Sequence, residues 1–264
     1  MPAEIRIERR DAVMIVTNDF PETRNALNPD FYDGFTRTLA EADADAGIGA
    51  IVLTGGGEFF CAGGDLNRLK MLGTLPEDER RSSIHRLHGM IRAMADCPKP
   101  IIAAVEGGAA GAGVSLAAAC DLIVMAADAY FSVAYVKIGL SPDGGATALL
   151  AQALPRQLMT EMCLTGDRVP AGRLQAAGLV NRVVEHGSVL EQAVTWAREL
   201  SAGPARSMAR VKSLCRAAQE NSLDAQLDME EGLMIASQTD PESIEGIGAF
   251  LDKRPADYAK LRRQ

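Results

Sequence analysis

Short apolar runs separated by polar segments dominate the first half of the chain. Residues 5–9 and 13–18 are predicted to form the two strands of a β-hairpin. Residues 50–54, 101–105 and 122–126 are continuous apolar runs bounded by glycine, proline or charge. Such runs are typical of strands buried on both faces of a sheet. The pattern therefore predicts an α/β fold for this half.

Two helices are expected between these strands. The segment Asn28-Pro29-Asp30 opens the first helix, because Asn28 can cap free amides, Pro29 suits the first turn and Asp30 complements the helix dipole. This helix is expected to run to about Asp45. The second is predicted to begin near Pro76 and to run through Met94.

After Gly144 the pattern changes to helical, with a single short strand expected at residues 180–184. The predicted helices cover residues 144–154, 157–164, 170–177, 189–200, 204–218, 223–237 and 241–252. The last ones carry apolar positions such as Leu223, Leu227 and Met234, which a lone domain would cover with difficulty. Packing against another subunit is therefore expected.

Composition and charge narrow the function classes. The chain has 264 residues, of which 47% are apolar and 23% charged, an ordinary globular mixture. Its 27 basic and 35 acidic residues give a net charge of −8, which argues against a nucleic-acid-binding surface. The longest uncharged run, residues 107–120, is too short to cross a membrane, and residues 1–10 lack the apolar core of a signal peptide. A cytoplasmic protein without nucleic-acid or membrane partners is expected.

The sequence predicts structural roles for the cysteines and for three acidic residues. The five cysteines show no C-x-x-C spacing, so neither a metal site nor a disulfide framework is predicted, and they are expected to be reduced, buried small residues. Asp65 is expected to fix its loop by accepting backbone N–H groups, and Glu106 and Asp121 to make structural hydrogen bonds.

Two loops of small residues, each following a predicted strand, carry the candidate chemistry. They are Phe60-Cys61-Ala62-Gly63-Gly64-Asp65-Leu66 and Gly107-Gly108-Ala109-Ala110-Gly111-Ala112-Gly113. Loops without bulky side chains let the backbone approach a ligand closely, and their free N–H groups can point at an oxygen that gains negative charge. Together the loops predict one oxyanion site. For either loop alone, a glycine-rich turn that lets a helix pack on a sheet would be the favoured interpretation, but not for two such loops in this order.

These loops, in their order, resemble those of the crotonase, or enoyl-CoA hydratase/isomerase, superfamily. The resemblance extends over nearly the whole chain. It includes the segments Arg24-Asn25-Ala26-Leu27-Asn28, Lys137-Ile138-Gly139-Leu140-Ser141-Pro142-Asp143-Gly144-Gly145, Leu164-Thr165-Gly166-Asp167, Ala177-Gly178-Leu179-Val180 and Phe250-Leu251-Asp252-Lys253-Arg254-Pro255.

The resemblance implies a spiral of ββα units over residues 1–200, followed by a helical trimerisation region over residues 201–264. It implies a homo-oligomer, a trimer or a dimer of trimers, that acts on an acyl-CoA. The family pattern assigns the oxyanion amides to Ala62 and Ala112. No metal and no cofactor is implied beyond the coenzyme A of the substrate.

The resemblance also implies contacts to the substrate. Arg24 resembles a residue beside the nucleotide of coenzyme A, and Phe250 and Lys253 resemble a contact that sometimes comes from a neighbouring subunit. Tyr135 is expected to shape the acyl pocket, because the usual pKa of a phenol, about 10, makes it a poor base. The stretch from residue 66 to 76 is expected to be flexible and to cover this pocket. The remaining predicted contacts are Ala26, Cys61, Asp65, Leu66 and Gly111.

The chain departs from the hydratase pattern at two positions. Where hydratases of this superfamily carry two glutamates that activate water, this chain has Ser115 and Tyr135. The remaining acid is Asp143, which resembles the catalytic aspartate of isomerases that act on 3-enoyl-CoA or on phenylacetyl-CoA epoxides. The similarity is strongest to the phenylacetate-pathway isomerases. The favoured interpretation is an acyl-CoA isomerase with Asp143 as the proton shuttle.

Three other functions stay open. Overall resemblance also fits an enoyl-CoA hydratase, and a non-catalytic acyl-CoA binder would keep the same loops. In aryl-CoA dehalogenases an aspartate at this position attacks the ring, with a histidine on the preceding helix, where this chain has His88. For both Asp143 and His88, a purely structural role is the alternative to a catalytic one. Asp143 can cap the helix that follows it, and His88 can be a plain helix residue beside His85 and Arg92.

Overall fold

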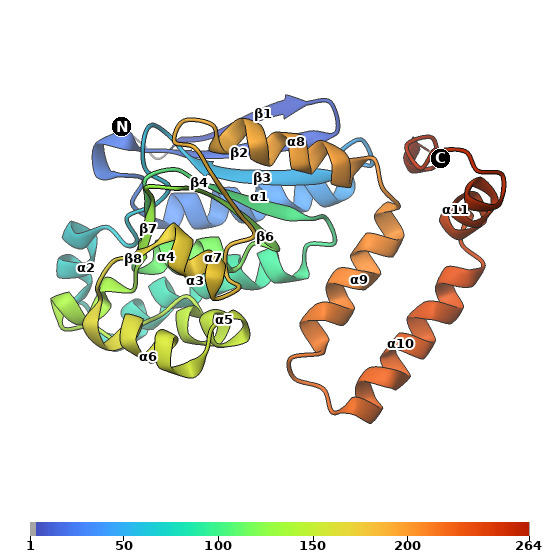
Figure 1. Cartoon of the computed structure of the whole chain (residues 1–264). Coiled ribbons are helices and arrows are strands. Elements are labelled where there is room, and N and C mark those ends of the chain that lie inside the picture. The colour runs from blue at the N-terminus through green and yellow to red at the C-terminus, as the bar shows by residue number, and fades with distance from the viewer. Residues whose placement is uncertain (1–3, 264) are drawn as a thin grey trace.

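The computed structural model describes residues 4–263, which form a six-stranded sheet covered by helices and followed by a helical lobe (Figure 1). Its strand order is β1-β2-β3-β4-β6-β9, with β1 and β2 antiparallel and the remaining pairs parallel. The strands are β1 (Glu4–Arg10), β2 (Val13–Asp19), β3 (Ala50–Gly55), β4 (Ile101–Val105), β6 (Leu122–Ala126) and β9 (Arg182–Val184). The predicted hairpin and the three predicted buried strands are confirmed.

A second, three-stranded sheet was not predicted. It has the order β5-β7-β8 and consists of β5 (Gly108–Ala110), β7 (Tyr130–Ser132) and β8 (Val169–Pro170). Strands of two or three residues are too short to show an alternating pattern. This small sheet matters for the site, because β5 belongs to the second small-residue loop.

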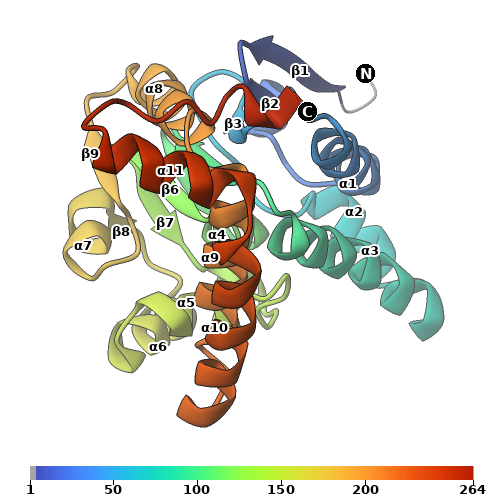
Figure 2. The ribbon, with the colours of Figure 1, turned by 90° about the vertical axis from the view of Figure 1, so that its right-hand side faces the viewer.

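The first two predicted helices are confirmed as α1 (Pro29–Ala44) and α3 (Glu77–Asp96), which pack against each other (Figure 2). The Asn28 side chain caps α1 by accepting the Phe31 N–H at 2.9 Å. No helix was predicted within residues 66–76, the stretch expected to be flexible, but residues 66–72 form the helix α2 (Leu66–Leu72). Asp65 accepts the N–H groups of the first turn of α2, as predicted for its loop.

The later helices agree with the predicted ones to within about two residues. Short 3-10 turns occur at η1 (Pro21–Thr23), η2 (Ala134–Ile138) and η3 (Leu261–Arg263). These later helices are α5 (Ala146–Ala153), α6 (Arg156–Thr165), α7 (Ala171–Ala176), α8 (Val189–Ser201), α9 (Ala205–Ala217), α10 (Leu223–Gln238) and α11 (Pro241–Leu251). A further helix, α4 (Ala112–Ala118), was not among the predicted ones. Within the described residues, no helix is long and apolar enough to span a membrane.

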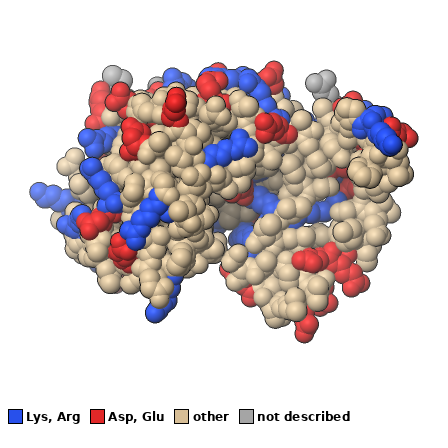
Figure 3. Space-filling view, in the orientation of Figure 1, with Lys and Arg blue, Asp and Glu red and all other residues tan. Residues whose placement is uncertain are grey.

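Helices α9, α10 and α11 extend away from the sheet (Figure 1), with a hollow between part of this lobe and the main body (Figure 3). Helix α9 still contacts the main body through the ion pair of Lys212 with Asp121. Charge holds this lobe together: Asp240 pairs with Arg206 and Arg210, and the Glu242 carboxylate accepts the N–H groups at the start of α9. Large apolar side chains on α10 and α11 are nevertheless exposed, among them Leu223, Met234, Ile235, Ile244, Ile247, Phe250 and Leu251.

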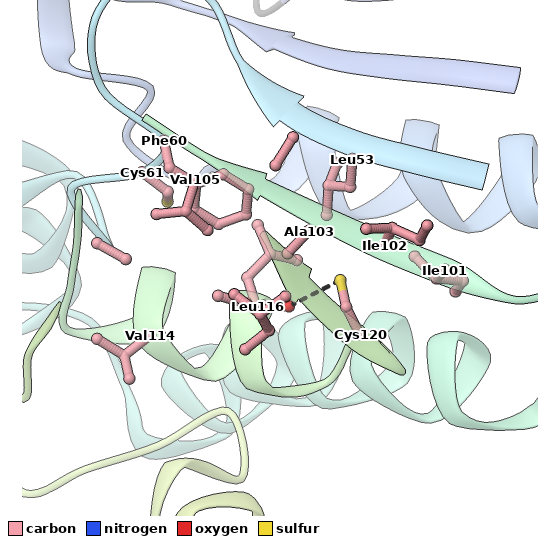
Figure 4. Close-up of a cluster of buried hydrophobic side chains, with 14 of the residues drawn as sticks. Leu53, Phe60, Cys61, Ile101, Ile102, Ala103, Val105, Val114, Leu116 and Cys120 are labelled. Carbon is pink, nitrogen blue, oxygen red and sulfur yellow. Dashed lines mark hydrogen bonds between the residues drawn. The ribbon is translucent and has the colours of Figure 1, made fainter. Parts of the chain in front are cut away.

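The core lies between the sheet and the helices that cover it (Figure 4). Strands β3 and β4 are buried along almost their whole length, as their apolar sequences require. Burial raises the pKa of the Cys61 thiol to about 12, and the Cys120 thiol donates to the Leu116 carbonyl at 3.5 Å. All five cysteines are free, but the expectation that all are buried was wrong, because Cys215 is exposed.

Two predicted structural acids join distant segments. Asp121 accepts the Ile101 N–H at 2.8 Å and pairs with Lys212 on α9. The Glu106 carboxylate accepts the Gly187 N–H at 2.9 Å. Both structural expectations are confirmed.

Asn25 fixes the loop that runs from β2 to α1. Its backbone has a φ of 59°, in the left-handed region that asparagine tolerates better than most residues. Its side-chain NH₂ donates to the carbonyls of Gly56 and Phe59 at 2.9 and 2.5 Å, and its Oδ1 accepts the Phe20 N–H at 2.7 Å. This buried amide therefore ties the loop after β3 to the loop after β2.

Replacing Asn25 by alanine is expected to lower the free energy of unfolding by about 2–3 kcal/mol, because buried backbone groups lose their partners. Chemical denaturation measures this change. Asn221→Ala is the matched control, since Asn221 is exposed and bonds only to Gln226 and its own helical turn. Equal stability of both variants would contradict the role given to Asn25.

Candidate active site

The two small-residue loops lie side by side, as their sequences predict. Cys61 forms a parallel bridge with Ala109, and the Ala110 N–H donates to the Cys61 carbonyl at 2.9 Å. Gly63 sits at one of the positions where they approach closely. Its φ is 89°, and a β-carbon at this position would lie 2.6 Å from the Ala110 carbonyl oxygen. Only glycine satisfies both conditions, so the loop sequence directly permits the contact.

A cavity of about 360 Å³ opens where the loops meet. Leu69 of α2 and Lys137, Ile138 and Leu140 of the turn around η2 form part of its wall, and none of them was predicted. The predicted site residues in its lining are Ala26, Ala62, Asp65, Leu66, Gly111, Ala112 and Tyr135.

The amide of Ala62 is not free, which corrects the predicted pair of oxyanion donors. The Ala62 N–H donates to the Arg24 carbonyl at 2.9 Å. A donor that is already satisfied inside the loop has no reason to turn toward a ligand. Ala62 therefore lines the cavity without supplying its N–H.

Gly64 offers the amide that Ala62 does not. Gly63 and Asp65 pair with Leu27: the Leu27 N–H donates to the Gly63 carbonyl at 2.7 Å, and the Asp65 N–H donates to the Leu27 carbonyl at 3.3 Å. In extended backbone the residue between two such neighbours points its own N–H the other way. The Gly64 N–H has no hydrogen-bond partner among residues 4–263, and Gly64 lines the cavity.

Ala112 supplies the second amide. It is the first residue of α4, where backbone N–H groups have no acceptor within the helix. No other part of the described chain accepts its N–H either. Gly64 and Ala112 therefore each bring a free N–H to the cavity lining. Sequence reasoning missed Gly64 because the pairing of its neighbours with Leu27 is a tertiary contact.

Asp143 is held by the two residues that replace the hydratase glutamates. The Tyr135 hydroxyl donates to the Asp143 Oδ1 at 2.8 Å, and the Ser115 hydroxyl donates to the Asp143 backbone carbonyl at 3.1 Å. Asp143 is half-buried and does not form part of the cavity lining. Its hydrogen-bond partner Tyr135 does line the cavity, and this contact connects Asp143 to the cavity.

The alternative role of Asp143 as a helix cap is not supported. Helix α5 begins at Ala146, its capping residue is Gly145, and no side chain accepts its first amides. Gly144 and Gly145 both have positive φ, 59° and 78°, so the chain turns sharply between Asp143 and the helix. The carboxylate faces Tyr135 instead.

Tyr135 donates a hydrogen bond to the Asp143 carboxylate and is not itself a base. Its side chain is 8% exposed, and burial together with the neighbouring Asp143 charge raises the pKa of its phenol well above the usual value. Tyr32 on α1, which sequence reasoning missed, has a raised pKa for the same two causes. Two protonated phenols therefore lie in the surroundings of one carboxylate.

His88 contacts the Asp143 turn. It is half-buried on α3, and its Nε2 accepts the Gly144 N–H at 3.4 Å. An accepting Nε2 places the ring proton on Nδ1. His88 is therefore a helix residue, as expected, but one that touches the segment carrying the candidate base.

Comparison with known proteins agrees with this geometry. A model of the family described as enoyl-CoA hydratase/isomerase matches residues 8–261. The chain belongs to this family. It is 34% identical to a 1,2-epoxyphenylacetyl-CoA isomerase of Escherichia coli K12, over 93% of this chain and 94% of that protein. It is 33% identical to a 2,3-dehydroadipyl-CoA hydratase of the same organism, over 97% of this chain and 98% of that protein.

The solved structures give the same result for the fold. A crystal structure of an enoyl-CoA hydratase from Polaromonas sp. JS666 superposes with a TM-score of 0.94 and 41% sequence identity, covering 96% of this chain and 98% of that one. The resemblance to the crotonase superfamily and the crotonase-like α/β fold are thereby confirmed. Acyl-CoA hydratase/isomerase chemistry is the activity of this family.

Four predicted contact residues of this family member lie outside the cavity. Cys61 is buried beneath it, where its Sγ accepts the Gly63 N–H at 3.4 Å. The Arg24 guanidinium stacks over the Phe59 ring, 5.6 Å from its centre, and lines a separate hollow. Phe250, whose side chain is 84% exposed, and Lys253 lie in the C-terminal lobe, far from α2 in Figure 1. One chain alone does not bring them to the cavity.

Proposed function

We propose that this protein is an acyl-CoA isomerase that moves a C=C bond, or rearranges a ring, through a thioester enolate. The observation that carries the proposal is a single carboxylate, Asp143, held by Ser115 and by Tyr135, which lines the same cavity as two free backbone amides. Isomerisation needs one proton shuttle and one oxyanion site. This site offers one of each.

The amides act first. A thioester oxygen placed between the Gly64 and Ala112 N–H groups accepts from both. As the α-carbon loses its proton, charge develops on this oxygen and both hydrogen bonds strengthen. Backbone donors fixed by the Leu27 pairing and by the start of α4 need no reorganisation at that moment.

Asp143 then moves the proton. Its carboxylate takes a proton from one carbon, and the C–H electron pair enters the conjugated enolate. The protonated acid returns the proton to a different carbon of the same system, so the double bond shifts and no atom is gained or lost. Tyr135 holds Oδ1, which leaves Oδ2 for the substrate.

Hydration would need more acid–base groups than the cavity holds. Water addition requires a base for the water and an acid for the carbon. Among the described residues, the carboxylate in the cavity lining is that of Asp65, and it already accepts the Asn67 and Arg68 N–H groups at the start of α2. The relatives are compatible with either activity, because one is named an isomerase and another a hydratase. The proposal rests on the site.

The proposal includes an oligomer and no resident cofactor. The exposed apolar face of α10 and α11 is expected to pack against further copies of the chain, in a trimer or a dimer of trimers. Such packing would allow Phe250 and Lys253 of one copy to contact the coenzyme A bound by another. The proposed steps use backbone amides and one carboxylate, so they require neither a metal nor a redox cofactor.

Mass spectrometry of a 3-enoyl-CoA incubated with the purified protein in heavy water tests the proposal. Deuterium incorporation with a shifted double bond and no added water is the expected result. A product heavier by one water would establish a hydratase and overturn the proposal. If neither 3-enoyl-CoA nor phenylacetyl-CoA epoxide is converted while acyl-CoA binding persists, the result contradicts the isomerase proposal for these substrates and leaves a different acyl-CoA substrate, a dehalogenase-like activity or a non-catalytic binder.

A further inference from the structure

Three potential metal ligands follow the carboxyl ends of three adjacent parallel strands. Glu106 comes directly after β4, Asp128 lies two residues after the end of β6, and His186 lies two residues after the end of β9. These strands are neighbours in the sheet, in the order β4-β6-β9. Because parallel strands end at one edge, residues far apart in sequence meet there, and ligand sites of open α/β sheets are built at such edges.

The three side chains converge on one point. His186 Nδ1 lies 3.1 Å from Glu106 Oε1 and 3.2 Å from Asp128 Oδ2. One ligand atom from each residue lies within 4.8 Å of the other two. A single Nδ1–H can be directed at one carboxylate only, yet both face it. Glu58, after the end of β3, adds further negative charge.

We propose that Glu106, Asp128 and His186 form a divalent-cation site whose preferred ion is zinc. A mixed set of one imidazole and two carboxylates suits zinc, with bonds of about 2.0–2.2 Å. Tetrahedral bonds of that length hold ligand atoms about 3.3–3.6 Å apart, close to the two distances from His186 Nδ1 to the carboxylate oxygens. The side chains of His186 and Asp128 are 52% and 64% exposed, so solvent can supply the fourth ligand.

The deepest ligand is already oriented by the fold. The Glu106 side chain is 16% exposed, and its Oε1 accepts the Gly187 N–H at 2.9 Å. Such a partner to a ligating carboxylate fixes its position before an ion arrives. The Glu106 carbonyl also accepts the Phe60 N–H at 3.0 Å, so an ion here would connect three strand ends to the first small-residue loop.

Isothermal titration of the full-length, tag-free protein with zinc chloride tests the site. The Cys215→Ser variant is the parent, because its exposed thiol would otherwise compete for zinc. One ion per chain and a rise in melting temperature with zinc are expected. His186→Ala should remove both, and Glu106→Gln should weaken binding at least tenfold.

His85→Ala is the matched control, since His85 is exposed on α3 and takes no part in the cluster. It should bind zinc like the parent. Absence of saturable binding by the parent, or equal binding by the His186→Ala variant, would overturn the proposal. All of these readouts are independent of enzymatic activity.

Discussion

Replacing Asp143 by asparagine is expected to lower kcat for isomerisation by about 10²–10⁴-fold, the usual contribution of one general acid–base group. The amide has nearly the shape of the carboxylate and can still accept the Tyr135 hydroxyl. It cannot take up a proton from carbon. The loss should therefore fall on turnover, with the affinity for acyl-CoA largely kept.

Stopped-flow or mass-spectrometric turnover, together with a competition assay for acyl-CoA affinity, separates these two effects. Asp43→Asn is the matched control, because Asp43 is an exposed aspartate of α1 outside the cavity. It should retain the rate of the unmodified protein. Undiminished turnover in the Asp143→Asn variant would show that another group moves the proton.

Tyr135 and Ser115 explain how a site can lose two glutamates and keep a defined geometry. Each hydroxyl donates to Asp143, one to its carboxylate and one to its backbone carbonyl. Neither can take a proton from water at neutral pH, Tyr135 because burial and the Asp143 charge keep its pKa high. The two positions thus hold in place the carboxylate that we propose as the base. This arrangement favours a single proton shuttle.

The sequence contains most of this fold because its signals are local. Buried strands such as residues 101–105 are continuous apolar runs, and the Asn28 cap of α1 lies next to the helix that it starts. Helix α2 was missed because its seven residues follow a loop and bury none of their side chains, so no apolar stripe marks it. The strands of the second sheet are likewise too short to be recognised.

The sequence predicts most of the residues that form the site but not the hydrogen bonds between them. Both small-residue loops, Asp143 and Tyr135 are evident in the sequence. The bond between Tyr135 and Asp143 depends on the turn at Gly139, where φ is 72°, and the choice of Gly64 over Ala62 depends on Arg24 and Leu27. Hydrogen bonds between distant segments decide which amides stay free. A single sequence does not reveal them.

Replacing Ala112 by proline is expected to lower kcat/KM by about 10²–10³-fold, the usual loss on removing one oxyanion donor. Proline has no N–H, and its fixed φ suits the first position of a helix, where Ala112 begins α4. No hydrogen bond within the described fold is lost, because the Ala112 N–H donates to none of its groups. The helix should therefore form normally, which circular dichroism and thermal melting check.

Two controls separate the lost donor from the added ring. Ala112→Gly keeps the N–H and should retain most of the activity. The proline ring replaces the N–H hydrogen with a carbon that points toward the cavity, so the affinity for a thioether analogue of acyl-CoA, which lacks the carbonyl, reports any steric effect. If the proline variant binds this analogue normally but turns over the thioester slowly, the Ala112 amide stabilises the enolate. Equal kcat/KM for the proline and glycine variants would contradict its role, and the oxyanion would then depend on Gly64 alone.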